Sequence, residues 1–546
     1  MQTIEREQEW KNIHKRALLN ESFVEVSLDI ADPDALADAS ADDNGAIYTS
    51  DSSQVTRQVD KITHPYCTLE QNLWCLDGSR TAIPESGFED DAYTSDVLCD
   101  ETCVFSAKRP TITIDFNETH SKIIPGITVT WSSTYGECAD TFEIIAYNES
   151  NAVVAQTEVT GNKAVKTLVP LEIVNYKRVV IIIKKWCLPN RRARVEGILV
   201  GLNKVYGKPA LFEYSHKQSV DPVSTSLPKF EIKFSVDNIE GEYNPHNPQG
   251  LAKYLMERQE VKARYGLKFD DGSIGWIDGG IFYLSEWYAK QNGMTADFTA
   301  RDLLEFMSEV HTDIHDLSER SLYELATEIL TAAHLPVGNN GTSRWLIDES
   351  LLNIKTTAPL PVDTLANNLQ LIANMAKCVL YQDRDGILRI EPLNGSETDT
   401  SYDTDYEINS FNSYSKSEIS LSKPLRQVRV KVYTYTAGDD GIESETAEVE
   451  YPASVPANVV GETLVIDNPL VTSSERALAL GEWMYNHLRH RMTLDSSWRA
   501  DVKLDALDIV KNVNAYNTRR VRMTEVEFKY NGAFRGTGKG KVIENG

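Results

Sequence analysis

The sequence predicts a mainly β protein with α+β parts: two small antiparallel β-barrels, a helical middle and a β-sandwich. Residues 229–236 alternate apolar and polar side chains, which is the period of a half-buried strand. Residues 111–200 contain short strand-like runs separated by turns, at a spacing typical of a β-sandwich. Residues 321–334 and 363–377 repeat apolar side chains at helical spacing. The middle of the chain is therefore expected to be helical.

Residues 227–307 form the stretch around which the rest of the chain is organised, and they predict the first barrel. Turn formers at 237–245 end its first strand. Asp270-Asp-Gly272 lies between strand-like runs and predicts a hairpin. The elements expected in this stretch are strands at 229–236, 261–269 and 281–288 and helices at 249–260 and 300–310.

The N-terminus predicts a helix, a strand and a linker. Residues 21–30 alternate as a strand, whereas residues 31–60 are rich in Asp, Ala and Ser and have no period. If the strand at 21–30 belongs with the barrel of residues 208–300, the sandwich between them is an insertion, which chains tolerate well. The sequence leaves this assignment open. The helix is expected over residues 1–20, with these apolar side chains near one face: Trp10, Ile13, Ala17 and Leu18.

The composition is strongly acidic, with a net charge of −26 at pH 7. A protein that grips duplex DNA neutralises phosphates with Lys and Arg, so this chain would repel DNA. An acidic wall can still line a channel through which DNA slides. The most apolar run, 179–183, is far shorter than the ~20 residues that cross a bilayer. Residues 1–10 lack the apolar core of a signal peptide. We therefore expect synthesis in the cytosol and no membrane insertion.

Six of the seven cysteines fall in the sandwich region. Three interpretations remain open: free structural thiols, at least one disulfide formed after release from the cell, or a metal site. No Cys-x-x-Cys pair is present and no His lies at a matching ligand spacing, which counts against zinc. The cysteines concerned are Cys67, Cys75, Cys99, Cys103, Cys138 and Cys187.

The predicted helices at 321–334 and 363–377 lead into a β-hairpin over residues 378–390. Ser318 and Glu319 provide cap-like chemistry before the first helix. The turn at Asp385-Gly386 joins the two strands. Asp383-Arg-Asp-Gly386 lacks the third oxygen ligand and the later Glu of an EF-hand loop, so a hairpin turn is predicted rather than a calcium site.

No catalytic constellation stands out. His311 and His315 are spaced i and i+4 as a metal pair could be, but the glutamate that metalloproteases carry between them is absent. His487 and His490 lie late in a helix expected at 474–490, where cations suit the dipole. Residues 536–541 resemble a phosphate loop only superficially and predict a polar C-terminal tail. We therefore predict no enzyme activity, no cofactor and no metal.

Four segments of the sandwich region resemble a known family: 66–78, 110–116, 142–144 and 192–198. They are similar to a discoidin-type (factor 5/8 type C) jelly roll of the variety found in phage and prophage structural proteins. The resemblance implies binding of glycans or other ligands through loops at one end of the sandwich. The candidate ligand-binding residues are Trp131, Tyr135, Arg191 and Arg192, because sugars stack on exposed aromatic rings. The alternative places Trp74, Trp131 and Trp186 in the core.

A second set of segments, in order over some 330 residues, resembles another family: 234–287, 381–390, 406–408, 426–433, 474–490, 499–510 and 521–536. These segments are similar to the hub proteins of phage tails and prophage-derived tail particles. The resemblance implies two related barrels per subunit and a ring of three subunits that adapts a six-fold tail tube to a three-fold tip. Leu507-Asp508 stands where members of that family often carry Gly-Asp before the penultimate strand, which puts that turn in doubt.

Together these expectations describe a non-enzymatic virion structural protein of the tail tip or baseplate, assembled in the host cytoplasm. The expected partners are two further copies in a homotrimer, the tail tube and distal tail proteins, a tape measure protein and a tip or fibre protein. Host-surface glycan is expected at the jelly roll, and DNA is expected to pass without specific binding. Domains are predicted at 1–60 (helix, first strand, linker), 61–202 (inserted jelly roll), 203–310 (first barrel), 311–400 (helical middle with hairpin) and 401–546 (second barrel with helix).

Two rival functions remain. A secreted or surface glycan-binding protein, or an accessory module of a carbohydrate-active enzyme, would need a signal peptide and an acid/base pair in a cleft. The sequence shows neither of these features. A tail lysin would need room for a lytic domain, and the chain is expected to end about ten residues after the last barrel strand.

Overall fold

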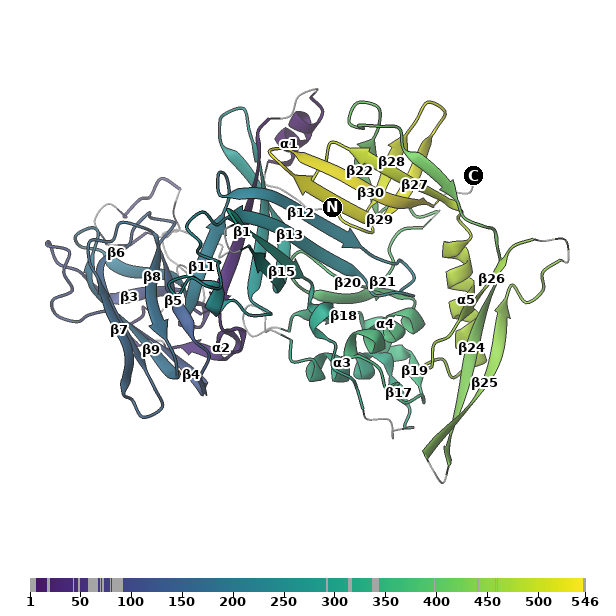
Figure 1. Cartoon of the computed structure of the whole chain (residues 1–546), viewed down its shortest axis with the longest axis horizontal. Helices are drawn as coiled ribbons and strands as arrows, with labels where there is room; N and C mark the ends of the chain where they lie inside the picture. The colour runs from purple at the N-terminus through teal and green to yellow at the C-terminus, as the bar shows by residue number, and fades with distance from the viewer. Residues whose placement is uncertain are drawn as a thin grey trace.

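The computed structural model describes the whole chain except residues 1–5, 17–19, 43, 48–49, 57–66, 69, 71–72, 79, 81–91, 291–292, 313–316, 336–342, 397, 439–440, 457, 459 and 544–546. Strands dominate and helices are few, which confirms a mainly β fold with α+β parts. The sandwich lies at one end of the molecule and a long β-hairpin at the other (Figure 1).

A 13-stranded sheet is the centre of the molecule. We call its N-terminal half the first β-unit and its C-terminal half the second β-unit. The first β-unit comprises β1 (Ser22–Ala31), β11 (Gly201–Tyr206), β12 (Leu211–Ser219), β13 (Lys229–Asp237), β14 (Glu260–Lys268), β15 (Ile274–Ala289) and β16 (Thr295–Arg301). The second β-unit comprises β22 (Asp403–Ile408), β23 (Glu418–Leu421), β27 (Met492–Trp498), β28 (Ile509–Val513), β29 (Thr518–Tyr530) and β30 (Phe534–Val542).

The two β-units, which lie in the regions predicted as two small barrels, are continuous in one sheet. β12 pairs antiparallel with β29, and Tyr214 lies opposite Tyr530 at one end of this register. One hydrophobic core extends under both units, from Val26 in the first to Phe528 in the second. The two predicted β regions therefore pair with each other along one edge. The alternation of residues within each region predicts its strands but not the strand with which each one pairs.

The N-terminal strand belongs to the first β-unit, as one of the two assignments predicted. β1 pairs with β14 on one side and with β11 on the other, so both ends of the sandwich segment return to the same sheet. Helix α1 (Glu7–His14) is shorter than expected, and Trp10 donates a hydrogen bond from its Nε1 to Asp501 Oδ1 at 3.2 Å. Ala17 and Leu18 lie outside the described residues.

Two helices expected in the first β-unit are wrong. At 249–260 the chain makes only the 3-10 turn η2 (Ala252–Tyr254), and Glu260 already begins β14. At 300–310 it makes η3 (Leu303–Phe306). Asp302 caps this turn through Leu304 N and also accepts from Phe230 N at 2.7 Å, which fixes the turn to the sheet. The hairpin at Asp270–Gly272 is confirmed.

The sandwich consists of two sheets, with strand orders β3-β10-β5-β8 and β2-β4-β9-β6-β7. Residues 31–60 are not simply a linker, because α2 (Pro33–Asp38) follows β1 and β2 pairs with β4. The strands are β2 (Ala39–Ala41), β3 (Tyr93–Leu98), β4 (Thr111–His120), β5 (Ile124–Trp131), β6 (Ala139–Tyr147), β7 (Val153–Val159), β8 (Lys166–Ile173), β9 (Tyr176–Trp186) and β10 (Arg192–Leu199), of which β2, β3 and β8 were not predicted.

The helical middle packs α3 (Leu322–Ala332) and α4 (Leu365–Ala376) beside the hairpin β20 (Cys378–Gln382) and β21 (Leu388–Pro392), as predicted. The cap of α3 is Ser321 with Glu324 in a capping box, so the expected cap at Ser318 and Glu319 is wrong. Short elements complete the region: β17 (Arg320–Ser321), β18 (Trp345–Ile347), η5 (Glu349–Asn353) and β19 (Lys355–Thr356).

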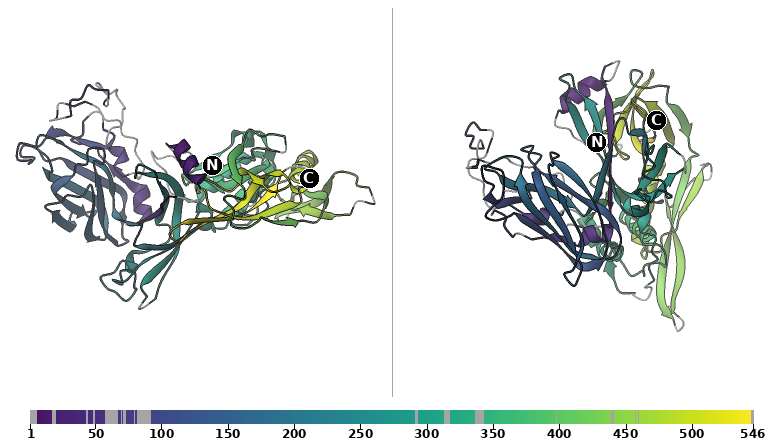
Figure 2. Two further views of the ribbon diagram at one scale, coloured as in Figure 1. Left: turned by 90° about the horizontal axis from the view of Figure 1, so that it is seen from above. Right: turned by 60° about the vertical axis from the view of Figure 1, so that its left-hand side comes forward.

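Residues 425–488 interrupt the second β-unit with a separate three-stranded sheet and a helix. β24 (Leu425–Gly438) and β25 (Gly441–Tyr451) form a long hairpin that projects from the molecule (Figure 2), and β26 (Glu462–Ile466) pairs with β24. Helix α5 (Ser474–Leu488) packs on this sheet and belongs to the same core as α3 and α4. The predicted second barrel therefore contains an extra subdomain.

Residues 536–541 are not a polar tail, because they lie inside β30 between β27 and β29. Gly536 allows Trp498 to pack against the backbone, since a Cβ there would lie 2.9 Å from the indole. Residues 536–541 alternate glycine with polar residues. Because the glycines face the core and carry no side chain, the sequence of this strand lacks the usual alternation of apolar and polar residues. Across the described residues, no helix has the length and hydropathy to span a bilayer.

Candidate functional site

The predicted ligand-binding residues lie near one another at one end of the sandwich, but Trp131 is not exposed. Its side chain is fully buried, packs edge-on against Phe142 and Trp186, and donates from Nε1 to Thr167 Oγ1 at 2.9 Å. It therefore offers no ring face to a sugar, and the core interpretation is correct for Trp131 and Trp186. Trp74, by contrast, is about half exposed.

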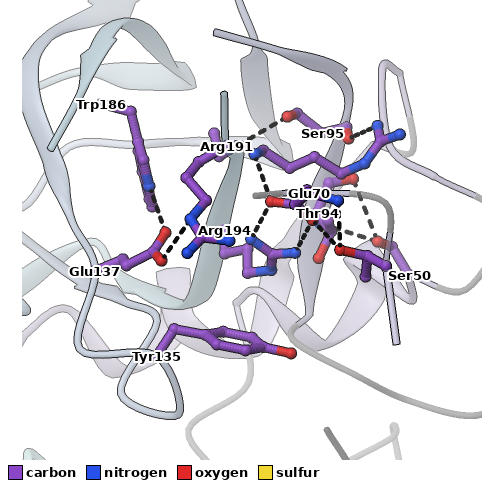
Figure 3. Close-up of polar contacts among 12 residues, drawn as sticks. Ser50, Glu70, Thr94, Ser95, Tyr135, Glu137, Trp186, Arg191 and Arg194 are labelled. Atoms are coloured by element: carbon purple, nitrogen blue, oxygen red, sulfur yellow. Dashed lines mark hydrogen bonds and ion pairs between the residues drawn. The ribbon is translucent and has the colours of Figure 1, made fainter. Parts of the chain in front are cut away.

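Arg191 forms a buried ion pair at this end of the sandwich (Figure 3). Its Nε lies 3.1 Å from Glu137 Oε1, and Trp186 donates from Nε1 to Glu137 Oε2 at 2.8 Å. The Arg191 side chain is only 9% exposed, and the Glu137 carboxylate compensates its charge, because an unpaired charge in the interior is costly. The guanidinium thus fixes the loop before β10 and presents little surface to a ligand.

A second buried pair joins Arg194 to Glu70. Arg194 Nη1 donates to Glu70 Oε2 at 2.9 Å, and the backbone N of Arg192 donates to the same carboxyl oxygen at 2.9 Å. Burial acts to raise the pKa of the Glu70 carboxyl, but the Arg194 ion pair outweighs it and holds the pKa below its usual value. Arg192 Nη1 donates to Ser95 O at 2.8 Å.

Tyr135 is one of two candidates that are partly exposed, and Arg192 is the other. The guanidinium of Arg194 lies 4.7 Å from the ring centroid of Tyr135. Arg80 lies over the same ring at 5.2 Å and donates to the Tyr135 hydroxyl at 3.2 Å. The end of the sandwich therefore carries an aromatic ring held by Arg194 and Arg80, a fixed and polar surface. Figure 3 shows Tyr135 beside Arg194.

All seven cysteines are free thiols. Cys138 and Cys187 are adjacent, because the Cys187 N donates to Cys138 O at 3.1 Å and the Cys138 N lies 3.3 Å from Cys187 Sγ. Among the described residues, no cluster of three or more His, Cys, Asp or Glu side chains could hold a metal ion. His311 lies 4.0 Å from Glu328, and His315 is outside the described part of the chain.

The junction between the two β-units contains a buried polar network that sequence reasoning missed. Arg384 Nε and Gln218 Nε2 both donate to Asp505 Oδ1 at 2.8 Å. Arg384 belongs to the turn Asp383–Gly386, whose glycine has a φ of +73°. The hairpin of the helical middle therefore places an arginine between the two β-units, beside a cavity of about 280 Å³. The turn motif was visible in sequence, but its partner Asp505 was not.

His216 of β12 lies in the same network and is fully enclosed. Its Nδ1 is 2.7 Å from the Tyr265 hydroxyl, which is also 2.7 Å from the Tyr214 hydroxyl. Burial, with help from the nearby Arg384 charge, lowers the pKa of His216 to about 3. The junction thus holds a neutral histidine at neutral pH.

Leu507 adopts a left-handed backbone with a φ of +76°, at the turn that the sequence put in doubt. Its N donates to Met523 O at 2.7 Å, and Asp508 O accepts from Met523 N at 2.9 Å. The turn is therefore kept without the glycine.

The far end of the sheet is an open edge. Among the strands that the structure describes, β23 pairs with β27 alone, and all four of its residues are exposed. Ile419 and Leu421 are each 62% exposed, and neighbouring loops expose Phe411 (89%) and Tyr516 (97%). Exposed apolar side chains on an unpaired strand edge are typical of a protein interface, because folded chains otherwise protect such edges.

Comparisons with solved structures give distant matches. A scan against protein-family models found no match, and neither did a search of curated proteins. The chain is similar to the prophage MuSo2 43 kDa tail protein from Shewanella oneidensis, at 12% identity and a TM-score of 0.41, over 62% of this chain and 95% of that one. Two further similar structures are tail proteins as well.

The second is the tail protein from Neisseria meningitidis MC58, at 12% identity and a TM-score of 0.39, over 63% of this chain and 94% of that one. The third is the prophage tail protein gp18 from Listeria monocytogenes EGD-e, at 10% identity and a TM-score of 0.37, over 63% of this chain and 92% of that one. These TM-scores lie below 0.5, so the functional proposal rests on the geometry of this chain.

Proposed function

We propose that this chain is a structural subunit of a phage-type tail, a hub or baseplate component that assembles as a homotrimer. The observation that carries the proposal is the open edge of β23, an apolar strand edge at the end of a continuous sheet. A second copy that covers this edge would remove both the unpaired backbone groups and the exposed apolar surface. The resemblance of the sequence to tail-hub proteins indicates that this assembly is a homotrimer.

The arrangement of the β-units supports a ring of three. Each chain contributes two β-units, joined edge to edge through β12 and β29. Three copies would present six units, which can match a six-fold tube on one side and a three-fold tip on the other. The role is geometric and needs no catalysis, and tail tube, distal tail, tape measure and tip or fibre proteins are the proposed neighbours. DNA passes through such a ring without specific binding, because a chain with a net charge of −26 repels the phosphates of DNA.

The edge of β23 gives a direct test. Changing Ile419→Lys together with Leu421→Lys places charges on the proposed contact and should reduce trimer to monomer, as measured by light scattering on the purified full chain. Val153→Lys on β7 is the matched control, because Val153 is a half-exposed β-branched residue on another edge strand. A trimer that survives the double change, or one that the control also disrupts, would contradict the proposal.

The sandwich supplies the proposed contact with the host surface. It lies apart from the junction and presents Tyr135 between two arginines. A glycan that stacks on Tyr135 would lose affinity about tenfold in Tyr135→Ala, measured on a glycan array with the intact protein. Tyr147→Ala, a partly exposed tyrosine at the end of β6, is the control. A strict monomer that binds glycans and fails to join tail particles would favour the glycan-binding alternative.

A further inference from the structure

A basic cavity lies between the end of α5, the strands β29 and β30, and the linker that follows β12. Its volume is about 530 Å³. Asp221 and Glu525 are its only acidic lining residues among those described. The cavity therefore has the opposite charge balance to the chain, whose net charge is −26. Five basic side chains line it: His487, Arg489, His490, Arg522 and Lys541.

Arg522 and Lys541 occupy directly opposite positions of neighbouring strands, β29 and β30. Residues directly opposite in an antiparallel pair project from the same face of the sheet, with Cβ atoms about 5 Å apart. Like charges in this arrangement repel and destabilise the pair. The register thus creates a local excess of positive charge that the rest of the fold must offset.

The neighbouring Arg520 shows how this sheet neutralises an arginine. Its Nε donates to Asp403 Oδ2 at 2.7 Å and its Nη2 to Asp403 Oδ1 at 2.5 Å. Arg522, two residues along the same strand, is only 4% exposed, yet its guanidinium donates to the carbonyl of Gly395 at 2.7 Å and forms no ion pair with a described carboxylate. A buried guanidinium without a carboxylate is costly.

Lys541 has a similarly incomplete environment. Its Nζ lies 3.4 Å from Leu488 O, at the C-terminal end of α5, and no described carboxylate lies within ion-pair distance. Asp221 faces the same space, but its carboxyl oxygens accept hydrogen bonds from the backbone N of Val223 and Thr225 at 3.1 and 2.8 Å. Glu525 is shared with Lys539 at 3.9 Å. The acids of the cavity therefore have other partners.

The pKa shifts of Arg522, Lys541 and His487 agree with burial beside other positive charges. Burial, and then the charge of Arg520, lowers the pKa of Arg522 to about 10. Burial also lowers the pKa of Lys541. The pKa of His487 is lowered by burial and further by the charges of Arg522, His490 and Lys541. A negative ligand would reverse each of these shifts, because it favours the charged form of every group around it.

We propose that this cavity binds a small organic anion that carries phosphate or carboxylate groups, held by Arg522, Lys541 and His487. Cavities of roughly 300–1,000 Å³ accommodate small-molecule ligands, so this one has room for more than a single inorganic ion. Charge-assisted hydrogen bonds from a guanidinium and an ammonium would provide the affinity. This site is independent of the proposed trimer contact at β23.

Calorimetric titration of the full chain tests the proposal, with inorganic phosphate and citrate as probes at constant ionic strength. We expect at least one probe to saturate. Saturation by phosphate identifies the phosphate class and saturation by citrate the carboxylate class. Lys541→Gln should weaken binding roughly tenfold. Lys529→Gln should leave it unchanged, because Lys529 lies on β29 beside Glu527 at 3.2 Å and does not line the cavity.

A spectroscopic measurement accompanies the titration. The His487 imidazole resonance should report a higher pKa in the presence of the bound probe, since an anion stabilises the protonated ring. If Lys541→Gln does not fold, His487→Gln takes its place in the titration, because His487 is only partly buried near the end of α5. The proposal is overturned if neither anion saturates, or if Lys529→Gln loses as much affinity as the cavity variant.

Discussion

The central sheet has a covered edge, where β12 of the first β-unit pairs with β29 of the second, and an open edge at β23. β12 and β29 pair over residues 214–219 and 525–530, and His216 and Phe528 lie opposite each other in the core of the junction. Among the described strands β23 has a partner on one side only, and Ile419 and Leu421 face solvent. Folding of a single chain therefore completes the junction between the β-units but leaves the sheet open at β23. The open edge is where a second copy is expected.

The largest loss of stability should come from a substitution at the covered edge. Arg384→Met removes the guanidinium that donates to the Asp505 carboxyl, to which Gln218 also donates. Loss of one partner of a buried ion pair costs about 3–5 kcal/mol, and the Asp505 side chain, which is 22% exposed, places this pair at the lower end of that range. We therefore expect the free energy of unfolding to fall by about 3 kcal/mol, measured by chemical denaturation with tryptophan fluorescence.

The matched control for that change is Lys423→Met. Lys423 pairs with Glu462, and both side chains are well exposed, so its loss should cost less than about 1 kcal/mol. Equal effects of the two substitutions would mean that the junction network does not hold the β-units together.

The second-largest loss of stability should come from low pH, which acts on His216 at the covered edge. The pKa of His216 is about 3 in the folded chain, because burial and Arg384 oppose its charge, against about 6.5 when unfolded. Below pH 6.5 the unfolded chain takes up a proton that the folded chain does not, so stability is lost as the pH falls from 6.5 towards 3. We expect His216→Gln to flatten this dependence by on the order of 2 kcal/mol between pH 6.5 and 4.5. Parallel pH profiles for the two proteins would contradict the assignment.

The smallest effect on stability should come from the open edge. Ile419→Lys changes an exposed side chain, so the free energy of unfolding of the separate chain should shift by no more than about 0.5 kcal/mol. Its effect is expected on assembly instead. A destabilisation as large as that of Arg384→Met, measured by the same denaturation, would show that Ile419 is packed within its own chain and would remove the contrast between the edges.

Sequence periodicity predicted the elements whose side chains alternate or repeat. The helices α3 and α4 and the hairpin at residues 378–390 follow from local patterns. β30 was missed, because glycines on its core face carry no hydrophobic signal. The helix expected at 300–310 was wrong, because Asp302 binds the backbone of Phe230 and limits the helix to a single 3-10 turn.

The candidate sites were harder to predict than the elements. Trp131 and Tyr135 are close in sequence, yet one is in the core and the other at the surface, and the register of β5 decides which. Arg384 and Asp505 are 121 residues apart, so no local sequence pattern predicts their ion pair. Pairings of this kind depend on how the sheets meet, which no single segment encodes.

Hydrogen exchange measured across a range of protein concentration tests the central claim most directly. If a second copy covers the open edge, the backbone amides of β23 gain protection as the concentration rises, whereas those of β7, an edge strand of the sandwich, do not. That is the result we predict. Exchange at β23 that stays fast at a concentration where light scattering shows a trimer would place the subunit contact elsewhere and contradict the proposed assembly.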